Sequence, residues 1–209
     1  ANIYLHYAQD LWADQWRGRH TGGDVIIVRY ADDSVVGFQY KNDAERFLKD
    51  LVERMGKFGL KLHPDKTRLI EFGRFAEANR RKRGEGKPET FDFLGFTFYK
   101  GVSGRGYWVV LKKTAQKRLS RFKKMVWGWC KKNRHSPLKW QFITLSSKLR
   151  GYYQYFGVMC NFNAIAKAFH YTLRAWKYLL SRRCHKGMVK IENLKALYSL
   201  PKPRIIHKI

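Results

Sequence analysis

Residues 25–40 read VIIVRYADDSVVGFQY. Two segments rich in Val, Ile, Phe and Tyr, 25–30 and 35–40, flank the polar segment ADDS. β-Branched and aromatic residues favour strands, whereas Asp and Ser favour turns. The stretch therefore predicts a β-hairpin that carries Asp32 and Asp33 at its tip.

The two neighbouring carboxylates indicate a site for a divalent cation. Two charges held together at the tip of an apolar hairpin lose part of their hydration and repel each other, and a bound cation relieves both costs. Mg²⁺ in particular binds one or two carboxylates together with waters and substrate phosphates. The pair therefore suggests phosphoryl chemistry, although Asp is also common in turns and the dipeptide alone favours a simple turn.

The segments on either side of the hairpin have helical periodicity. Residues 1–20 predict a helix with one apolar face. A second helix is expected from Asn42, a candidate N-cap, to Gly59, which ends it. The apolar face of the first helix would comprise Ile3, Tyr7, Leu11 and Trp12.

The chain after the second helix alternates between extended and polar segments. Residues 60–72 predict two strands joined by a turn. Residues 73–90 contain almost no large apolar side chain and predict an exposed, mobile loop. Residues 91–99 predict a pair of strands, and residues 107–111 a further strand.

The second half of the chain is helical and strongly basic. One helix is expected from Thr114, and two more at about 140–155 and 164–180. Residues 101–209 hold 25 Lys and Arg and a single acid, Glu192, whereas the first 100 residues hold 18 basic and 15 acidic residues. The charge of the whole chain therefore comes mainly from residues 101–209.

The composition excludes a disordered chain and indicates a polyanionic partner. The 209 residues are 44% hydrophobic and 16% aromatic, which is enough for one or two cores. A net charge of +27 makes nucleic acid the first candidate partner. No segment is apolar for long enough to span a bilayer, and the first residues lack the pattern of a secretion signal, so neither a membrane nor secretion is expected.

The cysteines favour a reducing compartment. Cys130, Cys160 and Cys184 are odd in number, widely spaced and without a C-x-x-C pair. Cys184 and His185 could supply half of a zinc site, but no second pair would complete four ligands. We therefore expect a cytoplasmic protein without structural zinc.

The residues Tyr30-Ala31-Asp32-Asp33 resemble the Y-x-D-D hairpin in the palm of reverse transcriptases. Further blocks resemble that family in the same order along the chain, and Phe93–Phe96 is similar to its primer grip. Leu149–Phe156, in the basic helices, resembles the thumb, or maturase domain X, of reverse transcriptases encoded by bacterial group II introns. The remaining similar blocks are Asn2–His6 and Gly59–Leu62 with Lys66 and Thr67.

The resemblance implies an α+β fold in which part of a right-hand polymerase palm, an antiparallel sheet with packed helices, precedes an all-α basic thumb bundle. The palm part would cover residues 1–111 and the thumb residues 112–185, followed by a basic tail, residues 186–209. The implied activity is RNA-directed DNA synthesis. The implied partners are the intron RNA, whose splicing and mobility the protein would assist, a primer–template and dNTP.

The resemblance also assigns roles to single residues. Asp32 would bind Mg²⁺ directly, and Asp33 would be a ligand or a close electrostatic partner, in a site for two Mg²⁺ ions. Lys66 would neutralise or protonate the departing pyrophosphate, or would be an ordinary surface charge. Residues beside the primer terminus or holding its backbone would be Tyr30, Ala31, Phe93, Leu94 and Gly95.

Basic residues of the segment 80–83 and of the second half are expected to contact RNA phosphates, whereas most aromatic residues of the second half are expected to be buried. The expected buried residues are Phe122, Trp129, Phe169 and Trp176. The expected RNA contacts are Arg80, Arg81, Lys82, Arg83, Lys117, Arg121, Lys124, Lys131, Lys132 and Arg134.

The family has a further catalytic aspartate, fingers and template-binding blocks for which this sequence has no counterpart. Asp10 and Asp14 fall in the first helical segment and are not assigned as the additional metal ligand. We therefore expect that the chain needs an N-terminal polymerase half and does not polymerise alone. Two alternatives stay open: a non-catalytic RNA-binding splicing factor, and a retroelement or defence-associated reverse transcriptase without a maturase role.

Overall fold

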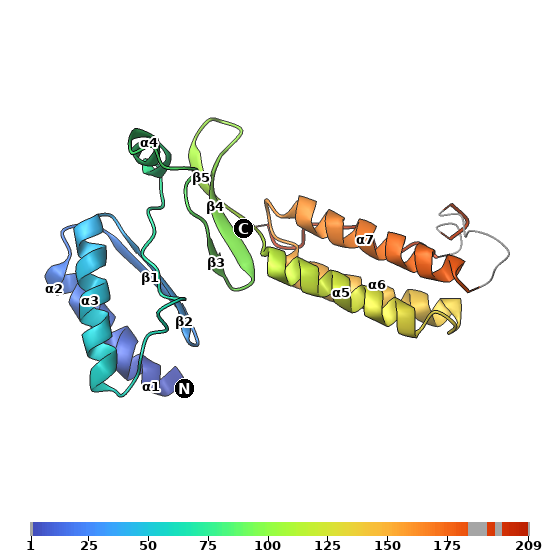
Figure 1. Ribbon diagram of the computed structural model, residues 1–209, viewed down its shortest axis with the longest axis horizontal. Helices are drawn as coiled ribbons and strands as arrows, with labels where there is room; N and C mark the ends of the chain where they lie inside the picture. The colour runs from blue at the N-terminus through green and yellow to red at the C-terminus, as the bar shows by residue number, and fades with distance from the viewer. Residues whose placement is uncertain (1, 184–191, 195–197, 209) are drawn as a thin grey trace. The chain divides into compact units, whose positions relative to one another are not determined.

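The computed structural model describes residues 2–183, 192–194 and 198–208. The chain divides into two compact units, Ala1–Phe72 and Gly73–Ile209. Both contain helices together with a small antiparallel sheet, which confirms the α+β class (Figure 1).

The first unit packs helices against the predicted hairpin. Strands β1 (Val25–Tyr30) and β2 (Asp33–Phe38) pair in antiparallel register, with Tyr30 opposite Asp33. Helix α3 (Lys41–Lys57) follows, and Gly59 adopts a left-handed φ of 66° just after its end. The N-terminal helical segment comprises α1 (Asn2–Leu5), the π-helix η1 (His6–Asp10) and α2 (Leu11–His20).

The core of this unit lies between α2, α3 and one face of the hairpin. Its buried centre contains Trp16 and Phe47, whose rings meet edge to face with centroids 4.9 Å apart. The Trp16 indole donates a hydrogen bond of 2.7 Å to Asp50, so its one polar atom is satisfied. The remaining buried members are Ala13, Leu51 and Met55.

The apolar face predicted for residues 1–20 is wrong in most of its members. Ile3, Tyr7 and Leu11 are exposed, and only Trp12 packs against the core. The five-residue π-helix interrupts the regular α-helical spacing, so the residues that face inward are not those of the α-helical pattern. The buried residues of the segment are Ala8, Gln9, Ala13 and Trp16.

Three local predictions also fail. Residues 60–72 form the predicted turn, closed by a hydrogen bond from the Lys66 amide to the His63 carbonyl, but no strands. Residues 73–90 contain a short helix, α4 (Ala76–Lys82), which is held by Lys100, whose ammonium group lies 2.5 Å from Glu77. Helix α3 starts one residue before Asn42, so Asn42 is not its N-cap.

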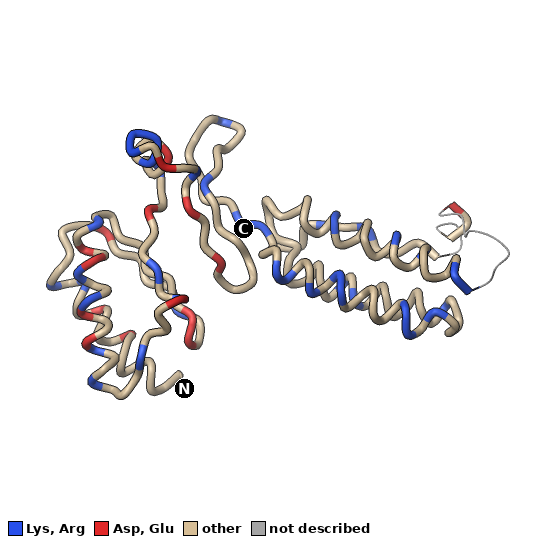
Figure 2. The backbone as a smooth tube through the Cα atoms, in the orientation of Figure 1, with Lys and Arg blue, Asp and Glu red and all other residues tan. Residues whose placement is uncertain are grey.

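The second unit joins a three-stranded sheet to three long helices. Strands β3 (Phe91–Phe93), β4 (Phe96–Val102) and β5 (Trp108–Thr114) pair antiparallel in that order. The helices are α5 (Gln116–Lys132), α6 (Leu138–Phe156) and α7 (Phe162–Ser181). Figure 2 shows Lys and Arg along all three helices, which contain no Asp or Glu.

The three helices share one apolar core, and buried polar bonds fix their ends. The Trp176 indole donates to Gln141, and the Gln141 amide donates to the Asn133 and Ser136 carbonyls in the α5–α6 connection. Of the expected buried aromatics, Phe122 and Trp176 are buried, and Trp129 and Phe169 are partly buried against the core.

The sheet is tied to the helices within this unit. The Thr114 amide donates to the buried Asn161 side chain, which also donates to the Thr114 hydroxyl. The domain boundary predicted between residues 111 and 112 stays a prediction. The structure adds that β5 runs almost directly into α5.

Part of the predicted tail, residues 186–209, and Cys184 and His185 lie outside the described residues. Leu194 and Leu200 are buried against the helices, and the Tyr153 hydroxyl donates to the Pro201 carbonyl over 3.1 Å. Within the described ranges, no helix is both long and apolar enough to cross a membrane.

Candidate active site

The hairpin between β1 and β2 turns through two residues, Ala31 and Asp32. Tyr30 and Asp33 close the turn as the last paired residues. Ala31 has a φ of 54°, in the left-handed region that residues with a side chain seldom occupy. Such a conformation persists only when neighbouring contacts hold it, so the contacts around Ala31 decide the geometry of the tip.

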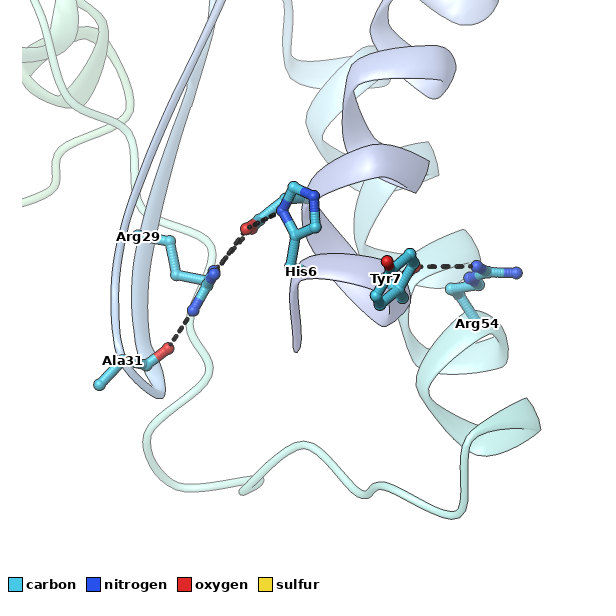
Figure 3. Close-up of polar contacts among 6 residues, drawn as sticks. His6, Tyr7, Arg29, Ala31 and Arg54 are labelled. Atoms are coloured by element: carbon cyan, nitrogen blue, oxygen red, sulfur yellow. Dashed lines mark hydrogen bonds and ion pairs between the residues drawn. The ribbon is translucent and has the colours of Figure 1, made fainter. Parts of the chain in front are cut away.

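Arg29 supplies one of these contacts. Its Nη1 atom donates to the Ala31 carbonyl over 2.7 Å, across the turn that follows it. Its Nε and Nη2 atoms donate to the two carboxylate oxygens of Asp10, over 2.6 and 2.5 Å. This planar, two-bond arrangement is the geometry that favours Arg over Lys. Arg29 therefore links the turn to the π-helix (Figure 3).

The π-helix presents two side chains to the hairpin. Beside Asp10, the buried Gln9 donates to the Ser34 hydroxyl on β2 over 3.2 Å. On its other side, Arg54 of α3 donates to the Tyr7 and Ala8 carbonyls, which helps fix the π-helix (Figure 3). The helix thus connects α3 to both strands of the hairpin.

The pKa shifts of the pair agree with this geometry. The hydrogen bonds from Arg29 lower the pKa of Asp10 below its ordinary value, and His6, 3.4 Å away, acts in the same direction. Asp10 in turn raises the pKa of Arg29. The pair stays ionised at neutral pH, with only 13% of the Arg29 side chain and 28% of the Asp10 side chain exposed.

Asp32 and Asp33 lie at the tip and are exposed. Within the described ranges, neither carboxylate has a hydrogen-bond or ion-pair partner, and no third His, Cys, Asp or Glu joins them in a metal-binding cluster. This donor set fits Mg²⁺, which needs few protein ligands and completes its shell with waters and substrate phosphates. The residues therefore suit a metal site that a phosphorylated substrate completes.

Phe93, Leu94 and Gly95 lie in the second unit, at the hairpin between β3 and β4. Leu94 and Gly95 form its two-residue turn with φ values of 49° and 78°, the pattern of a type I′ turn. The Tyr155 hydroxyl donates to the Leu94 carbonyl over 2.9 Å, and the Ala115 amide donates to the Gly95 carbonyl over 2.9 Å. Helices α5 and α6 therefore hold this turn in place.

A cavity of about 430 Å³ lies between this turn and the helices. Arg118 and Arg121 bring positive charge to it, and Tyr155 and Phe156 bring aromatic rings. Charged guanidinium groups beside aromatic rings suit the phosphates and bases of a nucleic acid. The structure thus places Gly95 and Arg121, both predicted from the sequence, at one cavity.

The remaining predicted residues do not line the cavity at Gly95 and are described within their own units. Lys66 is exposed in its turn, with no contact to Asp32 or Asp33. Arg80 of α4 lies 3.4 Å from Glu85 and 3.9 Å from Glu89, and Arg83 lies 2.7 Å from Glu85. The exposed candidates for RNA contact are Arg81, Lys82, Arg83, Lys117, Lys124, Lys131 and Lys132, together with Arg121 at the cavity, and Arg134 is partly buried.

The sequence reasoning missed Asp10 and Gln9. Arg29 could have indicated that a partner exists, because positions 25, 27 and 29 alternate toward the core and Arg29 is the one charged residue among them. A charge at such a position requires a partner of opposite sign.

Residues 1–98 match the family model for reverse transcriptase (RNA-dependent DNA polymerase). No curated protein matches the chain. The reverse transcriptase match contains the Asp32–Asp33 hairpin, the residues that brace it and the Leu94–Gly95 turn. It supports RNA-directed DNA polymerase activity in general.

Proposed function

We propose that the protein is a reverse transcriptase of a group II intron that also acts as a maturase. The observation that carries the polymerase assignment is the pair of unpartnered carboxylates, Asp32 and Asp33, on a braced hairpin within the matched region. Template and primer strands, dNTP and the intron RNA are its proposed partners.

The hairpin would act by holding Mg²⁺ against the reacting phosphates. Asp32 and Asp33 would hold the metal, and two ions in the complete enzyme would activate the primer 3′-hydroxyl and stabilise the departing pyrophosphate. Arg29 and Asp10 keep the tip from moving, because they fix the carbonyl beside it. Positioning of this kind is a large part of the catalysis of phosphoryl transfer.

The maturase assignment is supported by the charge of the second unit. Helices α5–α7 carry no acidic residue, and their exposed lysines and arginines would neutralise RNA phosphates. The cavity at Gly95, Arg118 and Arg121 would hold the primer strand near its end. The group II assignment itself rests on the resemblance of Leu149–Phe156 to the thumb of that class.

We further propose that polymerase activity requires an N-terminal polymerase half, on the same or a separate chain, that covers the hairpin. A two-stranded sheet is only marginally stable by itself. This one exposes the apolar side chains of Ile26, Val28 and Tyr30 on one face. The N-terminal polymerase half expected from the resemblance would supply both this cover and further metal ligands.

The test is primer extension on an RNA template with Mg²⁺. The chain is assayed alone and together with an added N-terminal half, in each case as the wild type and as the Asp32→Ala variant. We expect extension only with the added half and only with Asp32. Equal extension with Asp32→Ala would refute the role of the hairpin. RNA binding should be the same for both versions, because Asp32 lies outside the basic helices.

The alternative, a splicing factor without polymerase activity, is favoured by the concentration of positive charge in the second unit. It predicts no extension in any mixture, together with tight RNA binding that weakens with salt. A reverse transcriptase without a maturase role would instead show no preference for a structured intron RNA over an unrelated RNA of equal length.

A further inference from the structure

Helices α5 and α7 pack side by side, and a groove of about 380 Å³ lies on their outer surface. Lys124, Trp127 and Gly128 of α5 and Tyr171 of α7 line it. The three α5 residues recur at spacings of three and four, so they share one helix face. Lys131, at the next such position, extends this face with a further exposed charge.

Aromatic rings on this surface are exposed and already ordered. Trp127 is 39% exposed and stacks on Tyr178, which is 45% exposed, with ring centroids 5.6 Å apart and planes 26° from parallel. Arg182, the residue that follows the end of α7, lies over the Tyr178 ring at 5.0 Å. Tyr178 does not line the groove, so it supports the Trp127 ring from outside it.

Lysine side chains lie beside these rings, and no acidic side chain of the three helices neutralises their charge. Lys123 lies 5.4 Å above the Tyr171 ring at the groove, and Lys124 forms part of its wall. Helices α5, α6 and α7 contain no acidic residue that could pair with either lysine. An apolar protein partner would have to bury these charges unpaired, whereas a polyanion neutralises them.

We propose that this groove binds unpaired nucleotides of an RNA. A base would stack on Trp127 inside the groove, and Lys123 and Lys124 would contact the flanking phosphates. Duplex RNA keeps its bases stacked on each other, so only loops, bulges or ends offer a base to such a ring. The choice of RNA as the polyanion rests on the proposed function.

Gly128 allows a test that removes no existing contact. A Cβ atom built there meets no heavy atom within 4 Å, so a larger side chain projects into the groove. Gly128→Leu should fold at least as well as the wild type, because Leu favours a helix interior more than Gly does. Gly151→Leu on α6 is the matched control, since Gly151 is also helical, exposed and uncrowded.

The assay is fluorescence anisotropy of the full chain with a labelled, unstructured RNA of about 12 nucleotides. We expect Gly128→Leu and Trp127→Ala to weaken binding by about 10- to 100-fold, as for loss of one stacked base. Gly151→Leu should bind like the wild type. A duplex RNA of the same length should be insensitive to Gly128→Leu.

The salt dependence separates stacking from charge. Trp127→Ala should leave the slope of log K against log salt unchanged, whereas Lys124→Ala should reduce it by about 0.7, the effect of one phosphate contact on a single strand. Wild-type affinity in both Gly128→Leu and Trp127→Ala, or equal losses on duplex and single strand, would overturn the proposal.

These outcomes are independent of the polymerase test. Loss of RNA binding in Gly128→Leu with no primer extension in any mixture would support the groove and refute the proposed polymerase. Extension that depends on Asp32, with RNA binding unaffected by both Gly128→Leu and Trp127→Ala, would refute the groove alone.

Discussion

Removing the Asp10 carboxylate should loosen the tip of the β1–β2 hairpin. Asp10→Ala deletes both bonds to Arg29 and leaves a guanidinium that is only 13% exposed with one remaining bond, to Ala31. Exposed ion pairs contribute at most about 1 kcal/mol, and breaking a buried one costs about 3–5 kcal/mol. Since this pair is partly exposed, we expect a loss of about 2 kcal/mol.

Native-state hydrogen exchange of the β1 and β2 amides measures this loss directly. A destabilisation of about 2 kcal/mol corresponds to about 30-fold faster exchange by local opening. Asp10→Asn keeps an acceptor for one of the two bonds and should lie between Asp10→Ala and the wild type. In the complete polymerase, both variants should lower kcat more than they change KM for dNTP, because the tip is then less often in place.

Asp14→Ala is the matched control. Asp14 lies on the same helical segment, is 63% exposed, and pairs only with Arg17 at 3.3 Å. Its removal should leave hairpin exchange nearly unchanged. If Asp10→Ala leaves the protection of the hairpin amides within about twofold of the wild type, or if Asp14→Ala reduces it equally, the bracing role is refuted.

Two further predictions concern the pH dependence of the Asp10–Arg29 pair and the backbone conformation of Gly95. Because Arg29 lowers the pKa of Asp10, the stabilisation from this pair is complete above the ordinary pKa of 3.8 and is lost as the pH falls through the lower folded pKa. The hairpin protection of wild type and Asp10→Asn should therefore converge as the pH is lowered below the ordinary pKa of 3.8, and a constant difference would contradict this. Gly95→Ala should destabilise the second unit by about 1–2 kcal/mol, as measured by hydrogen exchange of its slowest amides. The added Cβ has ordinary space, 3.6 Å from Arg118, but alanine would have to adopt the φ of 78° that Gly95 has. Gly104→Ala is the control and should change little.

The sequence predicted best where local pattern and tertiary structure agree. The hairpin at residues 25–38, helix α3 and the three basic helices were recognised because apolar residues recur at the period of the element they form. Asp32 and Asp33 were placed at the tip for the same reason. Gly95 was placed in a turn, where its positive φ is needed.

The failures have physical causes that one sequence does not display. Leu60 and Leu62 alternate like strand residues, but they pack on the core of the first unit and find no strand partner. The polar segment containing α4 gains its helix through tertiary contacts such as Lys100 with Glu77. The bracing pair Asp10–Arg29 joins residues 19 positions apart, which no local pattern reveals.

The π-helix also determines whether the N-terminal helical segment can gain or lose a residue. It holds one more residue per turn than an α-helix would, and deleting one residue from His6–Asp10 could restore regular α-helical bonding. Each residue of an α-helix turns about 100° around its axis, whereas the π-helix spreads nearly the same total rotation over one more residue. Such a deletion would therefore leave the orientation of α1 relative to Asp10 nearly unchanged. The π-helix therefore allows the segment between Leu5 and Leu11 to gain or lose one residue while α1 keeps its direction relative to the hairpin.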